Sequence, residues 1–186
     1  ASRPESRAKA ALIQIIPLST VPAPEIEALL DAAFGTDRHG RTAYKLREGV
    51  STIEAMSFAA VEDGRLVGTI QAWPSVITNG ANSDPITLVG PVAVMPDAQQ
   101  KGIGKRLMTR LLESADAGVT DAMVMIGDPE YYGRFFGFTA DATGGWEVPG
   151  PVERHRLLAR ISRLGGLMPV GMLGPDLSFA RRAAAA

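Results

Sequence analysis

The sequence contains no cysteine and only two histidines among its 186 residues. A chain without thiols forms no disulfide, no thiolate-ligated zinc site and no cysteine acyl-enzyme. Two imidazoles are also too few for a three-histidine metal site. We therefore expect no bound metal and no covalent intermediate on sulfur.

The sequence also has no excess of charge and no long apolar run. Its formal net charge of −1 gives no electrostatic reason to bind nucleic acid or an anionic membrane. No apolar run reaches the length of a transmembrane helix, and the first residues lack the apolar segment of a secretory signal. We expect a cytoplasmic protein that binds neither nucleic acid nor membrane.

The length and composition predict one domain with two short ends. A hydrophobic content of 46% is sufficient for a single buried core in a chain of this length. We predict a mobile arm at residues 1–11, a single domain at residues 12–180 and a tail at residues 181–186, because both ends are rich in charged and small residues.

The periodicity of apolar residues and the positions of glycine and proline predict an α/β protein. The predicted order is strand, two helices, three strands, helix, strand, helix and strand, which gives a mixed sheet of about six to seven strands. Residues 78–85 are predicted to form a turn, and residues 165–175 a terminal loop. The predicted strands lie at residues 12–16, 58–61, 66–73, 88–94, 122–126 and 157–161, and the helices at residues 24–34, 42–48, 104–117 and within 128–138.

Residues 88–104, with the sequence LVGPVAVMPDAQQKGIG, form the most informative pattern in the chain. An apolar strand leads through a polar loop to two closely spaced glycines and an amphipathic helix. Amide groups at a helix N-terminus lack intrahelical partners and attract anions, and Gly102 and Gly104 carry no Cβ that would obstruct one. We therefore expect a phosphate-bearing ligand here, although a strand, a loop and a helix also occur in α/β proteins without such a ligand.

The loop matches neither common nucleotide motif. A G-x-G-x-x-G fingerprint requires a glycine where Leu107 stands, and a P-loop requires a glycine at Gln99 and a hydroxyl residue at Arg106. The remaining pattern is Gln99-x-x-Gly102-x-Gly104. It resembles the acyl-CoA signature Q/R-x-x-G-x-G/A of the GNAT superfamily of N-acetyltransferases.

The resemblance covers residues 58–161. Residues 58–73 resemble the hairpin that precedes the cofactor strand of this family, and residues 128–138 (DPEYYGRFFGF) resemble its tyrosine-bearing helix and Gly-Phe turn. The Gly-Asp-Pro-x-Tyr-Tyr form is closest to the bacterial YhbS-like branch. The sequence departs from the family at one point, because the usual tyrosine lies four residues before the glycine of Gly-Phe. That position is Gly133, whereas Tyr132 and Tyr131 lie five and six residues before Gly137.

The resemblance implies a fold, an activity and a set of site residues. The fold would be the GNAT α/β fold, with its mixed sheet splayed between the fourth and fifth strands. The activity would be transfer of an acetyl group from acetyl-CoA to an amine of a small molecule or a protein, by direct attack because there is no cysteine. Either Tyr132 or Tyr131 would be the general acid. The cofactor would be bound by Val92, Ala93, Val94, Gln99, Gln100, Lys101, Gly102, Ile103, Gly104 and Lys105.

Alternatives to this function stay open at this stage. A catalytically silent module that binds acyl-CoA as a sensor or docking domain would carry the same signature, and a longer acyl donor is also compatible with it. A homodimer is neither required nor excluded. The general base is not identified: the acidic candidates are Glu54, Glu62, Asp128 and Glu130, and a chain of water molecules is an equal alternative.

Several of these residues also have ordinary structural interpretations. The two tyrosines can be packing residues, and Asp128, just before Pro129, can be a helix cap. Gly90-Pro91 predicts a bulge in a central strand or a kink in an edge strand. The resemblance implies that the helix around residues 42–48 borders the acceptor site, where its side chains can recognise an acidic or polar acceptor or form an exposed stripe. The residues concerned are Arg41, Tyr44, Arg47 and Glu48.

Overall fold

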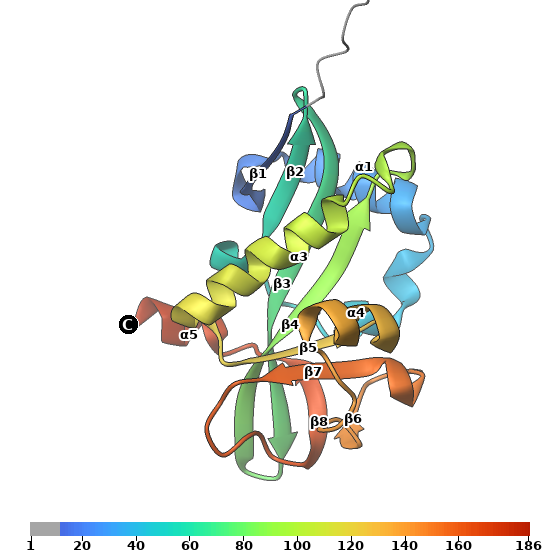
Figure 1. Ribbon diagram of the computed structural model, residues 1–186. Coiled ribbons are helices and arrows are strands. Elements are labelled where there is room, and N and C mark those ends of the chain that lie inside the picture. The colour runs from blue at the N-terminus through green and yellow to red at the C-terminus, as the bar shows by residue number, and fades with distance from the viewer. Residues whose placement is uncertain (1–11) are drawn as a thin grey trace, which may run out of the picture.

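A mixed eight-stranded sheet forms the centre of the molecule in the computed structural model, which describes residues 12–186 (Figure 1). The strand order is β1-β2-β3-β4-β5-β7, and β8 pairs with both β3 and β6. The β4–β5 and β6–β8 pairs are parallel, and the others are antiparallel. The strands are β1 (Ile13–Pro17), β2 (Phe58–Glu62), β3 (Arg65–Asn79), β4 (Asn82–Val94), β5 (Ala122–Ile126), β6 (Gly145–Glu147), β7 (Leu157–Ile161) and β8 (Val170–Pro175).

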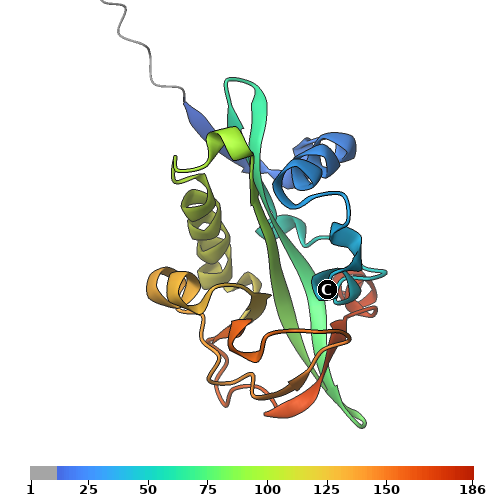
Figure 2. The ribbon, with the colours of Figure 1, turned by 90° about the vertical axis from the view of Figure 1, so that its right-hand side faces the viewer.

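Helices cover both faces of the sheet (Figure 2). Helix α3 packs against one face through Ile103, Leu107 and Leu111, while α1 packs against the other through Ile26, Leu29 and Leu30. This burial follows the apolar spacing of each helix. No helix of residues 12–186 is long and apolar enough to cross a membrane. The helices are α1 (Ala23–Phe34), α2 (Thr42–Lys45), α3 (Ile103–Ser114), α4 (Pro129–Phe136) and α5 (Phe179–Ala184).

The third and fourth strands are longer than predicted. They form one hairpin in which Asn79 pairs with Asn82 across a two-residue turn, so most of residues 78–85 is strand rather than turn. The prediction was wrong because the polar residues of this segment resemble a loop. Their main chain is nevertheless held by pairing between the strands and, over Ser75–Thr78, by β8.

Residues 165–175 were predicted to form a terminal loop, but they contain strand β8. The glycines that suggested a loop permit close packing here, since a Cβ on Gly171 would lie 2.6 Å from a methyl carbon of Ile77 and 2.8 Å from the carbonyl oxygen of Thr78. Together with the short β6, this strand raises the strand number above the six to seven predicted.

Of the two predicted chain ends, only the C-terminal tail lies within the residues that the structure describes. The predicted arm, residues 1–11, lies outside the described residues. The predicted tail at 181–186 begins inside α5, where Arg182 forms an ion pair with the buried Asp176. The predicted boundary at residue 180 therefore falls within a helix.

Strands β4 and β5 separate after a short paired segment, as predicted. They pair only at Thr87↔Met123 and Leu88↔Val124. Immediately beyond this point β4 contains the cis peptide bond Gly90-Pro91, and its register with β3 shifts opposite Ile70–Ala72. Gly90-Pro91 therefore marks a bulge in a central strand and not a kink at an edge.

Candidate active site

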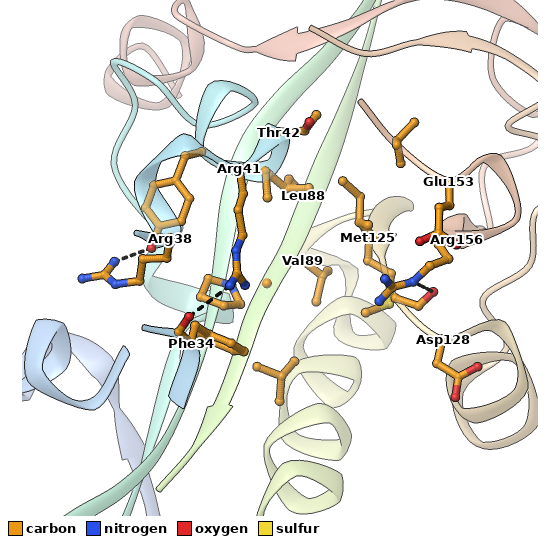
Figure 3. Close-up of a pocket in the computed structure, with 18 of the residues that line it drawn as sticks. Phe34, Arg38, Arg41, Thr42, Leu88, Val89, Met125, Asp128, Glu153 and Arg156 are labelled. Atoms are coloured by element: carbon orange, nitrogen blue, oxygen red, sulfur yellow. Dashed lines mark hydrogen bonds between the residues drawn. The ribbon is translucent and has the colours of Figure 1, made fainter. Parts of the chain in front are cut away.

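A cavity of about 990 Å³ lies where β4 and β5 separate. Its floor is formed by residues 88–92 of β4, and its walls come from the segment around α2 on one side and from the end of β5, α4 and residues 151–156 on the other. Figure 3 shows Arg38 and Arg41 on one side of Val89, and Asp128 and Arg156 on the other. The gap in the sheet is thus lined by charged and aromatic side chains from distant parts of the chain.

The predicted phosphate cradle lies at the N-terminus of α3. Gly102 caps this helix with a left-handed backbone (φ 73°), and Gln100 also has a positive φ of 67°. Alternating left-handed residues turn successive amide groups toward one concave surface that suits an anion. A Cβ on Gly102 would meet no atom within 4 Å, so this glycine is required for its backbone angle and leaves open space above it.

The cradle and the cavity meet at Val92. The position of a Cβ on Gly104 lies 3.8 Å from side-chain carbons of Val92 and Val94, and Val92 also lines the cavity. From Val89 onward the β5-facing edge of β4 has no strand partner among residues 12–186. An elongated ligand can therefore run from the cradle along this free edge into the cavity.

The predicted cofactor residues are divided between surface and core. Ala93 and Ile103 each have about 1% of their surface exposed and point into opposite cores, so only their main chains can face a ligand. Gln99, Gln100 and Gly102 are exposed. Which of these residues bind a cofactor stays a prediction.

The basic side chains of Lys101, Lys105 and Arg106, beside the two glycines, already have partners in the protein; the first two were predicted to bind the cofactor. The Lys101 ammonium donates to both carboxylate oxygens of Glu62, at 3.0 and 3.1 Å. The Lys105 ammonium lies 4.7 Å from the ring centroid of Phe135, and Arg106 donates to the carbonyl oxygen of Ile13. Of these three, only Lys105 is directed toward α4.

Both candidate tyrosines line the cavity. Their ring centroids lie 5.0 Å apart with an edge-to-face orientation. Burial, together with the negative charges of the Tyr131 phenolate form and of Asp128, raises the pKa of Tyr132 to about 12, while Arg156 opposes the shift. The Tyr132 phenol therefore retains its proton throughout the neutral range.

Asp128 begins helix α4 as its N-cap. Its carboxylate accepts a hydrogen bond of 3.0 Å from the Glu130 amide, and Pro129 occupies the first turn, so the predicted capping interpretation is confirmed. Asp128 is also the only one of the four candidate bases that lines the cavity. A further carboxylate there belongs to Glu153, which the sequence did not single out because nothing in residues 151–156 forms a motif.

The predicted stripe around α2 is split between surface and interior. Arg41 and Glu48 are exposed, whereas Arg47 has only 8% of its surface exposed and its guanidinium lies over the Tyr44 ring. Arg38, which lies between the two predicted helices at 24–34 and 42–48, is 2% exposed and lines the same cavity. Its burial depends on Glu27 and Asp31 of α1, so no local pattern indicated it.

The chain belongs to the GNAT acetyltransferase family: the acetyltransferase (GNAT) domain model matches residues 14–140. Among curated proteins it is similar to the uncharacterized N-acetyltransferases YjhQ and YhbS of Escherichia coli strain K12. The identity to YjhQ is 26% over 72% of this chain and 75% of that protein, and the identity to YhbS is 29% over 62% of this chain and 67% of that protein. The predicted family and its YhbS-like branch are confirmed.

Two solved structures cover nearly the whole chain. Escherichia coli YhbS, in complex with CoA, aligns with a TM-score of 0.67 and 26% identity, over 92% of each chain. A GNAT family acetyltransferase from Brucella melitensis, in complex with acetyl-CoA, aligns with a TM-score of 0.61 and 27% identity, over 90% of this chain and 98% of that chain. The fold is therefore the GNAT fold, as predicted.

Proposed function

We propose that the protein is an acetyl-CoA-dependent N-acetyltransferase in which the acceptor amine attacks the thioester directly. The observation that carries this proposal is the junction at Val92, where the cradle at the start of α3 meets the cavity between β4 and β5. A pyrophosphate at the cradle and a thioester in the cavity fit the two ends of one elongated cofactor. The CoA and acetyl-CoA complexes of the two similar proteins support this placement.

The residues around the cavity suit the chemistry of acyl transfer. The amine nitrogen attacks the thioester carbonyl carbon, the carbon–sulfur bond breaks, and the thiolate leaves. Main-chain amide groups of β4 near Val92–Val94 are proposed to stabilise the oxyanion, because this edge of β4 has no strand partner among the described residues. The Tyr132 phenol is proposed to donate its proton to the departing sulfur. Water in the cavity would accept the proton that the amine loses.

A turnover assay tests the proposed activity. The purified protein is incubated with acetyl-CoA and a panel of amines, and the release of the CoA thiol is measured together with the affinity for acetyl-CoA by calorimetry. We expect tight binding of acetyl-CoA and amine-dependent release of the thiol. Binding of acetyl-CoA without release of the thiol for every amine would instead favour a silent acyl-CoA-binding module. Release of the thiol only with longer acyl-CoA donors would show that the donor is not acetyl-CoA.

A further inference from the structure

Arg47 is a buried cation that has no carboxylate partner among the residues that the structure describes. Its side chain lines the cavity, only 8% of its surface is exposed, and no acidic group of residues 12–186 forms an ion pair with it. Burial lowers the pKa of this guanidinium, which reflects the cost of removing its charge from water, although an arginine stays protonated in proteins. Buried charges in proteins are normally paired, so the lack of a partner requires an explanation.

Arg38, on the same wall of the cavity, shows how the protein pairs a buried arginine. Its guanidinium forms ion pairs with Glu27 and with Asp31 of α1 and donates to the Tyr44 hydroxyl. These partners lie within the protein and leave Arg38 no need of a ligand. The two neighbouring arginines therefore differ: Arg38 forms ion pairs with two carboxylates, whereas Arg47 forms none with the described residues.

The Arg47 guanidinium is held in a fixed position by aromatic rings. It lies 3.7 Å from the ring centroid of Tyr44 and 4.6 Å from that of Trp73. The Trp73 indole is itself anchored, because its Nε1 donates a 2.8 Å hydrogen bond to the Gly90 carbonyl oxygen. Stacking of this kind occupies the faces of the guanidinium and leaves its N–H edge for a planar anion.

The charges around the cavity are arranged so that its two walls differ. On the α2 wall, exposed Arg41 adds a second cation whose only hydrogen bond to a described residue runs to the Phe34 carbonyl oxygen. The carboxylates of Asp128 and Glu153 lie on the opposite wall, together with one cation, Arg156, whose Nε donates to the Gly127 carbonyl oxygen (Figure 3). An acceptor with a positive amine at one end and a negative group at the other matches this arrangement.

We propose that the acceptor is a small amine that also carries a carboxylate, and that Arg47 binds this carboxylate while the amine lies toward α4. This inference rests on the proposed acetyltransferase function and names the class of its acceptor. The planar N–H edge of a guanidinium forms paired, charge-assisted hydrogen bonds with a carboxylate. The carboxylate would supply the charge that the fold does not provide for Arg47.

A matched panel of amines tests this acceptor class. Amino carboxylates with increasing separation between amine and carboxylate are compared with their amides, with alkylamines of equal length and with aminoalkyl phosphates. Thiol release gives kcat/KM for each amine, and calorimetry gives its affinity for the CoA-loaded protein. We expect an amino carboxylate to exceed its own amide by about 10- to 100-fold in kcat/KM, as the loss of a charge-assisted hydrogen bond implies.

Variants assign this preference to Arg47. Arg47→Met keeps the apolar stem, and we expect it to remove the preference for the carboxylate mainly through KM, while the affinity for acetyl-CoA is unchanged. Arg47→Lys keeps the positive charge but loses the planar guanidinium that forms paired hydrogen bonds, so it should recover part of the preference. Arg134→Met is the matched control, because Arg134 is exposed on α4 outside the cavity, and it should behave as the unmodified protein.

The possible results separate this inference from the proposed activity. Equal turnover of carboxylates and amides, or a preference that survives in Arg47→Met, overturns the inference while leaving acetyl transfer intact. A stronger, Arg47-dependent preference for the phosphates overturns the choice of carboxylate. If no amine is acetylated, the proposed activity fails, and calorimetry still decides whether amino carboxylates bind through Arg47. A purely structural role would lower the melting temperature of Arg47→Met without changing selectivity.

Discussion

The ring of Tyr132 packs directly against the main chain of Gly127. A Cβ added to Gly127 would lie 2.7 Å from the ring carbons Cδ2 and Cε2 of Tyr132, closer than nonbonded carbons approach one another. Gly127 follows β5, and Tyr132 lies on the helix that begins two residues later. The absence of a side chain at the end of β5 therefore sets the position of the proposed acid.

The first prediction follows from this contact. In Gly127→Ala the added methyl group would displace the Tyr132 ring, and a misplacement of about 1 Å near the reacting atoms costs up to about 10²-fold in rate. We expect kcat to fall by about 10- to 100-fold, with the affinity for acetyl-CoA retained. The control is Gly144→Ala, because a Cβ there meets no atom within 4 Å, and it should leave kcat unchanged. Full activity in Gly127→Ala would show that the ring position does not matter.

The second prediction distinguishes the two tyrosines of α4. Tyr132→Phe removes only the hydroxyl, and we expect kcat to fall by about 10²–10⁴-fold, the range for loss of a general acid, with little change in acetyl-CoA affinity. Tyr131→Phe serves as the matched control on the adjacent residue and should change kcat little. The reverse result would assign the role of general acid to Tyr131. Full activity of both variants would indicate that water donates the proton to the thiolate.

The third prediction concerns pH. The pKa of Tyr132 is raised to about 12, so the proton that the acid donates is present below this value and is lost only as the pH rises through it. The ordinary pKa of a tyrosine phenol is about 10. We expect kcat to show no decline from loss of this proton between about pH 7 and that value. A titration of kcat across this range is the measurement. A descending limb near pH 8 that persists in Tyr132→Phe would point to another acid.

The fourth prediction concerns the cradle. Gly102→Glu places a side chain and a negative charge where the pyrophosphate is proposed to bind, and we expect CoA binding by calorimetry to be lost while the protein stays folded. Gly64→Glu is the matched control, because Gly64 also has a positive φ (80°) and open space around it but lies in the β2–β3 turn. Both variants bear a similar backbone cost of about 1–2 kcal/mol. Normal CoA affinity in a folded Gly102→Glu would contradict the cradle.

The sequence predicted the features that depend on local pattern. The strand, the glycine pair and the helix of residues 88–104 lie together in the chain, and the cap at Asp128 requires only its own helix. The bulge at Gly90-Pro91 follows from a proline in an apolar strand. These features therefore needed no knowledge of distant contacts.

Features that depend on distant partners could not be predicted in this way. The sequence of β8 resembles a loop. In the structure this segment is a strand in which Gly171 packs against Ile77, which lies far earlier in the chain. Arg38 and Arg47 look alike in the sequence, and only the carboxylates of α1 make one of them a neutralised structural residue. The proposed acceptor side of the cavity is assembled from such contacts, whereas the proposed cofactor side depends on one continuous segment.

The location of Trp73 also gives the protein an internal optical reporter. The chain has two tryptophans. Trp146 is buried in the core with 1% of its surface exposed, and its Nε1 donates a hydrogen bond to the Met168 carbonyl oxygen. Trp73 is half-buried, its ring stacks against the Arg47 guanidinium, and its Nε1 donates a hydrogen bond to Gly90 in the bulge of β4. A change in tryptophan emission on adding a ligand would therefore come from Trp73, the indole that connects the proposed acceptor side to the strand along which the cofactor is proposed to bind.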